Sequence, residues 1–333
     1  MDRRTLLAAP TVLLSRPADA QPPALSARKP GNFPSRPIEL IVAFPAGGGM
    51  DVTARILARH AERLTGHRFV VNNRTGGAGM VAHNFMAKQA SPDGYTMGIL
   101  SSGVFVDGVL RSEGRWSIDD LEIAAFINYD PSTWIVAASG PLQGLDLRAI
   151  VSRAREAPDS VRVAMLPQSA SEFIIEQVER GTGARFTKVP FQGGIPGMTA
   201  MLGGHIDVAT VFFSEFRAQF EAGAVRPVGI AGPAPVPNLP GVPTFDSTLG
   251  TNGIHWAAWR FAMLPRNVPQ DRRDYLAAIV EAVVADPEAQ RDFTQAGVLL
   301  DPSFGTGDAM RASAARLFAA QLRFLRESGR VAT

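Results

Sequence analysis

A glycine-rich turn near the start of the chain lies between an apolar segment and an amphipathic one. Ile38–Phe44 (IELIVAF) is expected to form a buried strand, Pro45–Met50 (PAGGGM) a turn, and Asp51–Leu64 an amphipathic helix. The first N–H groups of a helix lack an internal partner, and the helix dipole favours negative charge beside them. Glycines let an anion approach the backbone closely. The sequence therefore predicts an anion site at this turn, formed by unpaired backbone N–H groups.

Composition excludes several classes of function. The chain has 333 residues, 46% of them hydrophobic and 19% charged, which suits one large or two medium domains and argues against wholesale disorder. The net charge is only +2 and no run of lysine or arginine occurs, so no nucleic-acid partner is expected. The absence of cysteine excludes disulfides, thiolate nucleophiles and cysteine metal sites.

Residues 1–20 have the pattern of a secretory signal peptide. Arg3 and Arg4 precede the short apolar run LLAAPTVLL, and Ala18–Ala20 (ADA) fits a cleavage site, which leaves both the Sec and the twin-arginine routes open. Residues 21–35 are rich in proline and are expected to be a linker. No segment has the roughly 18 uninterrupted apolar residues of a transmembrane helix. We expect export to the periplasm.

Beyond the linker, strand-like and helix-like segments alternate at a spacing typical of a parallel α/β sheet. Proline-rich joints separate two such runs, which predicts two α/β lobes with a ligand between them, at the carboxyl ends of the strands. Lobe 1 is expected to comprise residues 36–133 and 255–333, and lobe 2 residues 134–254. The chain is expected to cross between the lobes, with hinges near residues 134–139 and 251–256.

Motifs for nucleotides, metals and nucleophilic catalysis are missing. The glycine turns fit neither G-x-G-x-x-G nor G-x-x-x-x-G-K-[ST]. None of the five histidines is paired at a spacing of two, three or four residues, so we expect them on the surface or at strand ends, and no metal. No G-x-S-x-G elbow is present, and the serines after strands are expected to cap helices or form hydrogen bonds.

Small polar residues follow several of the predicted strands. They occur at residues 47–48, 101–103, 168–171 and 192–194. Together they offer many neutral hydrogen-bond donors but no evident base of the kind that proton transfer requires. This pattern favours capture of a small carboxylate over cleavage of a bond.

Short motifs along residues 33–297 resemble those of one family, the Bug-type solute receptors of tripartite tricarboxylate transporters. Val42–Arg55 (VAFPAGGGMDVTAR) is similar to the family's VPFPAGGGTDVVAR, and Val71–Gly79 (VNNRTGGAG) to VENRPGAGG. Further similar motifs are FPSRPI at 33–38, SPDGYT at 91–96, VPFQGG at 189–194, GGHID at 203–207 and LPGVPT at 239–244.

The resemblance implies a two-lobed type II periplasmic-binding fold with no catalytic activity and no cofactor. It implies an organic acid held between the lobes, with a ligand carboxylate at the loop through Ala46, Gly47 and Gly48, and delivery to the membrane subunits of a transporter. The residues expected at the ligand are Phe44, Ala46, Gly47, Gly48, Asp51, Ser101, Ser102, Gly103, Gln168, Ser169, Ser171, Gln192, Gly193 and Asp207.

One departure from the family bears on the ligand. Gln192 stands where the family usually has lysine, and the lost charge favours a monocarboxylate, an amide or an aromatic acid over a tricarboxylate. The main prediction is therefore a monomeric receptor for a small mono- or dicarboxylate, aromatic acids included. Two alternatives stay open: a ligand sensor for a signalling partner, and an exported hydrolase that uses Ser101 or Ser169.

Overall fold

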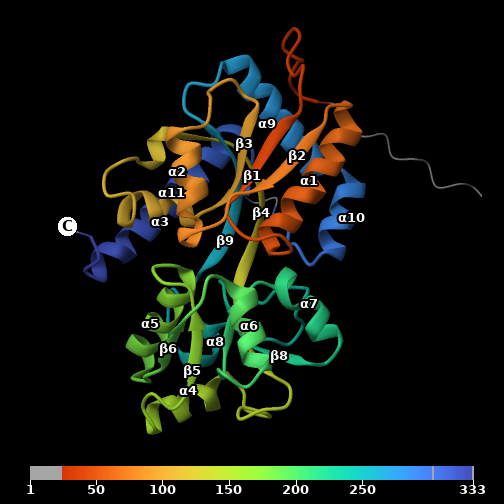
Figure 1. Cartoon of the computed structure of the whole chain (residues 1–333). Coiled ribbons are helices and arrows are strands. Elements are labelled where there is room, and N and C mark those ends of the chain that lie inside the picture. The colour runs from red at the N-terminus through yellow and green to blue at the C-terminus, as the bar shows by residue number, and fades with distance from the viewer. Residues whose placement is uncertain (1–24, 302–303, 332–333) are drawn as a thin grey trace, which may run out of the picture.

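The computed structural model describes residues 25–301 and 304–331, which form the two α/β lobes seen in Figure 1. Lobe 1 contains β1 (Ile38–Val42), α1 (Gly49–Thr65), β2 (Phe69–Asn73), η1 (Gly77–Gly79), α2 (Met80–Lys88), β3 (Thr96–Ser101), α3 (Gly103–Leu110), η2 (Ile118–Asp120), β9 (Ala257–Pro265), α9 (Gln270–Ala285) and α10 (Pro287–Gln295). Lobe 2 contains α4 (Leu147–Glu156), β5 (Arg162–Met165), α5 (Ala170–Thr182), β6 (Thr187–Pro190), α6 (Gly194–Leu202), β7 (Ala209–Val211), α7 (Phe213–Glu221), β8 (Val225–Ala231) and α8 (Phe245–Leu249). Two elements, β4 (Leu121–Ala137) and α11 (Gly307–Glu327), contribute to both lobes. The predicted two-lobed α/β fold is confirmed.

The larger sheet is mixed rather than parallel. Its order is β2-β1-β3-β9-β4-β7, with β8 also paired to β4. β1 is parallel to β2 and β3, whereas β9 is antiparallel to both β3 and β4. The prediction of a parallel sheet is wrong at the centre, because β9 brings the chain back from lobe 2 and so enters lobe 1 against the direction of β3.

β4 joins the lobes as one strand of 17 residues. Its first part, to Pro131, pairs with β9, and the part from Ser132 onward pairs with β8 and, over a shorter stretch, with β7. Proline has no N–H to donate, so Pro131 fits where the strand changes partners. The returning chain lies beside this point: Trp256 N–H donates to Ala231 O (3.1 Å), and Ser132 N–H donates to Trp256 O (2.9 Å).

Each lobe has its own hydrophobic core, and α11 packs against both. In lobe 1 the core lies between the sheet and its covering helices, and Met310 of α11 belongs to it. Farther along the same helix, Phe324 packs against Phe173 and Trp256 in the core of lobe 2. A second, smaller cluster in lobe 2 lies around Phe216. α11 therefore ties the lobes together beside β4 and β9.

Local sequence explains several helix boundaries. Gly66 adopts the left-handed conformation (φ 69°) that ends α1, and Asp146 caps α4 by accepting the N–H of Ala149 at 2.8 Å. Sequence reasoning missed α3, whose valines and glycines have low helix propensity, and α8, which has only five residues. No helix in the described ranges is both long and apolar enough to cross a membrane.

Candidate functional site

A cavity of about 290 Å³ lies between the lobes and is lined by residues of both. Five helices begin at it, because its wall includes the N-cap residues of α1, α3, α5, α6 and α7, which are Gly48, Ser102, Ser169, Gly193 and Phe212. The first two helices belong to lobe 1 and the other three to lobe 2. Helix N-termini carry partial positive charge, so this cavity favours an anion.

Most residues that the sequence singled out line this cavity. They are Phe44, Ala46, Gly48, Ser101, Ser102, Gly103, Gln168, Ser169, Ser171, Gln192 and Gly193. Gly47, Asp51 and Asp207 are not part of its wall.

Asp51 fixes the shape of the glycine turn from behind. Its buried carboxylate accepts hydrogen bonds from Gly47 N (2.9 Å), Arg55 Nε (2.8 Å) and Asn73 Nδ2 (3.0 Å). Burial alone would raise the pKa of Asp51, but these hydrogen bonds together hold the pKa below its ordinary value. Asp51 is therefore an ionised support of the turn.

Asp207 is a similar ionised structural support in lobe 2. Its carboxylate accepts Arg162 N (2.8 Å) and Nε (3.0 Å) on one oxygen and Nη2 (2.8 Å) on the other. Burial would raise the pKa of Asp207, and the bonds from Arg162 lower it below the usual range. The pair connects β5 to the segment that leads into β7, away from the cavity.

The amides of the glycine turn are not free, which corrects the prediction of unpaired N–H groups. Gly47 N–H donates to Asp51, Gly48 N–H to Pro45 O (3.3 Å), and Gly49 N–H to the carboxyl group of Glu215. The sequence could not show this, because Glu215 belongs to α7 of lobe 2. The turn does face the cavity, but it does so with its amides already paired.

Glu215 is the group through which lobe 2 reaches the start of α1. Its carboxyl group accepts Phe212 N–H at 3.1 Å as well as Gly49 N–H, and it lines the cavity. Burial between the lobes raises the pKa of Glu215 to about 7, with the charge of Asp130 adding to the effect and the two amides opposing it. Glu215 thus changes charge near neutral pH.

A buried ion pair lies behind the same junction. Arg260 of β9 donates to Asp130 of β4 at 3.1 Å, and both side chains are almost fully buried. Ser214 of α7 donates to the same carboxylate oxygen at 3.0 Å. The Ser214 hydroxyl of lobe 2 therefore contacts an ion pair formed by the two crossing strands, beside the N-terminus of α1.

The strand-end serines are engaged in local structure. Ser102 Oγ donates to Ala257 O at 3.3 Å, and Ser169 Oγ donates to Leu166 O at 2.7 Å while accepting Ser171 N–H at 3.3 Å. Within residues 25–301 and 304–331, no histidine forms a hydrogen bond with these serines. Their geometry is that of turn and cap residues.

Two histidines are buried in helices, which corrects the expectation of surface or strand-end positions. His83 of α2 lines the cavity, and its Nδ1 lies 2.6 Å from Asp107 Oδ2 of α3. Sequence spacing gave no signal for this pair, because the two residues meet only through the packing of α2 on α3. Arg111 and Gln321 also line the cavity without having been predicted.

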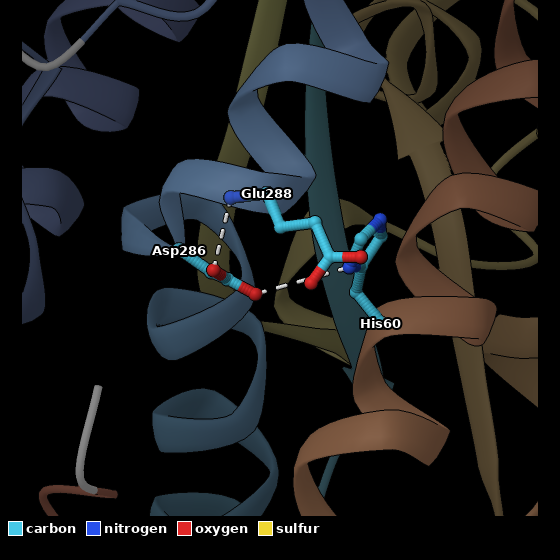
Figure 2. A group of neighbouring side chains, drawn as sticks. All are labelled: His60, Asp286 and Glu288. Atoms are coloured by element: carbon cyan, nitrogen blue, oxygen red, sulfur yellow. Dashed lines mark hydrogen bonds and ion pairs between the residues drawn. The ribbon is translucent and has the colours of Figure 1, made fainter. Parts of the chain in front are cut away.

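His60, the second buried histidine, belongs to the group drawn in Figure 2, with Asp286 and Glu288 from the start of α10. One ligand atom from each of the three lies within 4.8 Å of the others, a spacing that would suit a metal ion. Arg63 of α1 forms ion pairs with both carboxylates, and His60 Nε2 lies 2.6 Å from Asp292. The group is therefore explained as an ion-pair network between α1 and α10.

Comparison with known proteins places the chain in a family. The model of the tripartite tricarboxylate transporter family receptor matches residues 53–306. A Pseudomonas sp. (strain P51) protein from the tcbD-tcbE intergenic region is 28% identical over 268 residues, 80% of this chain and 79% of the relative. The periplasmic binding protein BugD has the same fold, with a TM-score of 0.80, 24% identity, and coverage of 89% of this chain and 99% of BugD. An R. palustris protein solved with adipate also has this fold, with a TM-score of 0.80, 24% identity, and coverage of 89% of this chain and 98% of that protein. The chain belongs to the receptor family of the tripartite tricarboxylate transporters.

Proposed function

We propose that this protein is an exported solute receptor that captures a small organic carboxylate between its lobes and delivers it to the membrane subunits of a tripartite tricarboxylate-type transporter. The convergence of five helix N-termini from two lobes on one cavity carries this proposal. Membership of the receptor family and the adipate in a relative of the same fold support it. The proposed leader, residues 1–20, lies outside the described residues.

The walls of the cavity suit a ligand with an apolar body. Phe44 and Val106 line it from lobe 1, Met165 and Phe212 from lobe 2, and Trp256 from the crossing segment. With about 290 Å³ available, a small mono- or dicarboxylate fits, and aromatic acids are included in the proposal. The apolar walls contribute affinity by burial, and the helix N-termini select for negative charge.

We assign direct ligand contact to the predicted residues that line the cavity, and a supporting role to Gly47, Asp51 and Asp207. The receptor would be a monomer with two moving lobes, one made of residues 36–133 and 255–333 and the other of residues 134–254. The lobes would move about Trp256 and the point in β4 where its pairing changes from β9 to β8. A ligand that touches both lobes binds the closed arrangement better than the open one, and so shifts the population toward closure. The closed form would then be recognised by the membrane subunits.

The test is ligand-induced thermal stabilisation with adipate, hexanoate, malate and benzoate. A ligand present at 100 times its Kd stabilises by about 2.7 kcal/mol, equivalent to a rise in Tm of roughly 5 °C. Gly48→Val should abolish this rise, because φ at Gly48 is −73°, which valine tolerates, and the new side chain lies on the cavity wall. Gly140→Val, at an exposed loop glycine without positive φ, is the matched control.

Two results would reject the proposal. One is the absence of a Tm rise with all four acids, each added up to millimolar concentration. The other is an equal rise in the wild type and in Gly48→Val, which would place the ligand elsewhere. Transport is tested separately, by uptake of a labelled acid that binds, in cells with and without this protein.

A further inference from the structure

His83 is a cavity residue with an unused hydrogen-bonding atom. The side chain is 2% exposed, and its Nε2 has no hydrogen-bond partner. A Cβ on Gly79 would lie 3.1 Å from Cε1 and 3.5 Å from Nε2, so glycine at this position leaves that edge of the ring uncovered. A buried polar atom without a partner is costly, which points to a partner that is absent from the free protein.

Asp107 determines which atom of His83 is available. One carboxylate oxygen accepts from His83 Nδ1, and the other accepts from Arg111 Nε at 2.8 Å. Arg111 also donates to the carbonyl oxygens of Gly77 (3.2 Å) and Ala78 (2.9 Å), which fixes the guanidinium group. Because the carboxylate only accepts, Nδ1 carries a proton, and Nε2 is the atom free to bind a ligand.

The charges around the ring indicate what that ligand atom is. Asp107 and Arg111 from α3 are the charged groups beside His83, and Trp116 contacts the ring at its edge. The other charged groups on the cavity wall are Glu215 of α7 and Arg260 of β9. The positive charge of Arg111 already offsets the negative charge of Asp107. A protonated His83 would therefore carry a positive charge that no further acid of α3 neutralises.

We propose that His83 is a specificity-determining residue whose protonated Nε2–H donates to a carboxylate oxygen of the captured acid, with Asp107 as its positioning residue. The inference rests on the proposed function and adds to it a cationic contact on lobe 1. Only the doubly protonated ring can donate from Nε2 while Nδ1 donates to Asp107, so acids should bind more tightly at pH 5.5 than at pH 8.0. A charge-assisted hydrogen bond of this kind corresponds to about a tenfold to hundredfold change in Kd.

Titration calorimetry at pH 5.5 and pH 8.0 tests this, with those of adipate, hexanoate, malate and benzoate that bind the wild type. His83→Gln should weaken binding at pH 5.5 by at least about tenfold and reduce the pH dependence. His205→Gln, at an exposed histidine away from the cavity, should behave as the wild type. Glu215→Gln should keep the part of the pH dependence that His83→Gln removes.

A second measurement does not depend on the stability of the variant. In wild-type protein labelled with 15N-histidine, the Nε2 resonance of His83 should shift on saturation with a bound acid. Acids that bind the wild type and His83→Gln equally at both pH values, with an unmoved Nε2 resonance, would overturn this inference and leave the proposed function intact. Tighter binding at pH 8.0 that depends on His83 would overturn it too, because Nε2 would then be an acceptor. Failure of every acid to bind the wild type would instead reject the proposed function.

Discussion

Replacing Glu215 by glutamine should flatten the dependence of stability on pH. Burial between the lobes raises the pKa of this carboxyl group from 4.5 to about 7. Between these values the folded protein keeps a proton that the unfolded chain releases, so the free energy of unfolding falls as pH rises through this window. At about 1.4 kcal/mol per pH unit the full window amounts to roughly 3 kcal/mol. Because the carboxyl group faces the cavity, water screens part of this, and we expect about 2 kcal/mol.

Thermal unfolding followed by circular dichroism at pH values from 5.0 to 8.5 measures the effect. Glutamine cannot ionise and keeps an oxygen that can accept an N–H, so the loss of Tm from pH 5.0 to 8.5 should be about 4 °C smaller in Glu215→Gln than in the wild type. Glu221→Gln, at an exposed position of the same helix, is the control and should retain the wild-type slope. Parallel curves for the wild type and Glu215→Gln would refute the raised pKa and, with it, the burial of this group between the lobes.

Three further predictions concern the supports of the junction. Asp130→Asn leaves the buried Arg260 without its counter-charge and should lower the free energy of unfolding by about 3 to 5 kcal/mol in chemical denaturation; a loss below 1 kcal/mol would show that the pair is not buried. Gly49→Ala places a Cβ 2.5 Å from Ser214 Oγ and 2.7 Å from Arg260 Nη2. It should therefore lower the free energy of unfolding by about 1 to 3 kcal/mol and weaken acid binding. Tm and Kd values equal to those of the wild type would contradict this. Asp51→Ala should lower the free energy of unfolding by about 2 to 4 kcal/mol at pH 7. Because the pKa of Asp51 is lowered in the folded protein, the difference in this free energy between variant and wild type should shrink as pH falls below about 4. A difference that does not depend on pH would contradict the ionised state of Asp51.

The fold was largely predictable from sequence because its signals are local. The apolar run of β1, the glycine turn and the amphipathic pattern of α1 lie within 28 residues of one another, and the structure places this strand and helix close to the predicted bounds. The errors arose where distant segments decide. Asp130 and Pro131 interrupt the apolar pattern of β4, and only the change of partner from β9 to β8 and β7 explains how one strand accommodates them.

The candidate site divides in the same way. Strand-end residues such as Ser102 and Ser169 could be located from sequence, since ligands bind at the carboxyl ends of parallel strands. Ser102 follows β3 of the larger sheet, and Ser169 follows β5 of a separate two-stranded sheet. Asp51 was assigned to the ligand, yet it binds the turn itself, four residues before it in the chain. Glu215 was missed because its partner, Gly49, lies in the other lobe, and His83 because it meets Asp107 only through the packing of α2 on α3.

The titratable groups of the cavity act together on its charge. When Glu215 is protonated and the histidine is charged, three basic groups face two ionised acids; when both have lost their protons, two basic groups face three acids. The groups counted are His83, Arg111, Arg260, Asp107 and Glu215 on the cavity wall, with Asp130 behind the wall as the partner of Arg260. A monoanionic ligand neutralises the first state and adds to the negative excess of the second. Since helix N-termini favour an anion at every pH, the titratable groups set the pH range in which an acid is held, and the helix N-termini set where it is held.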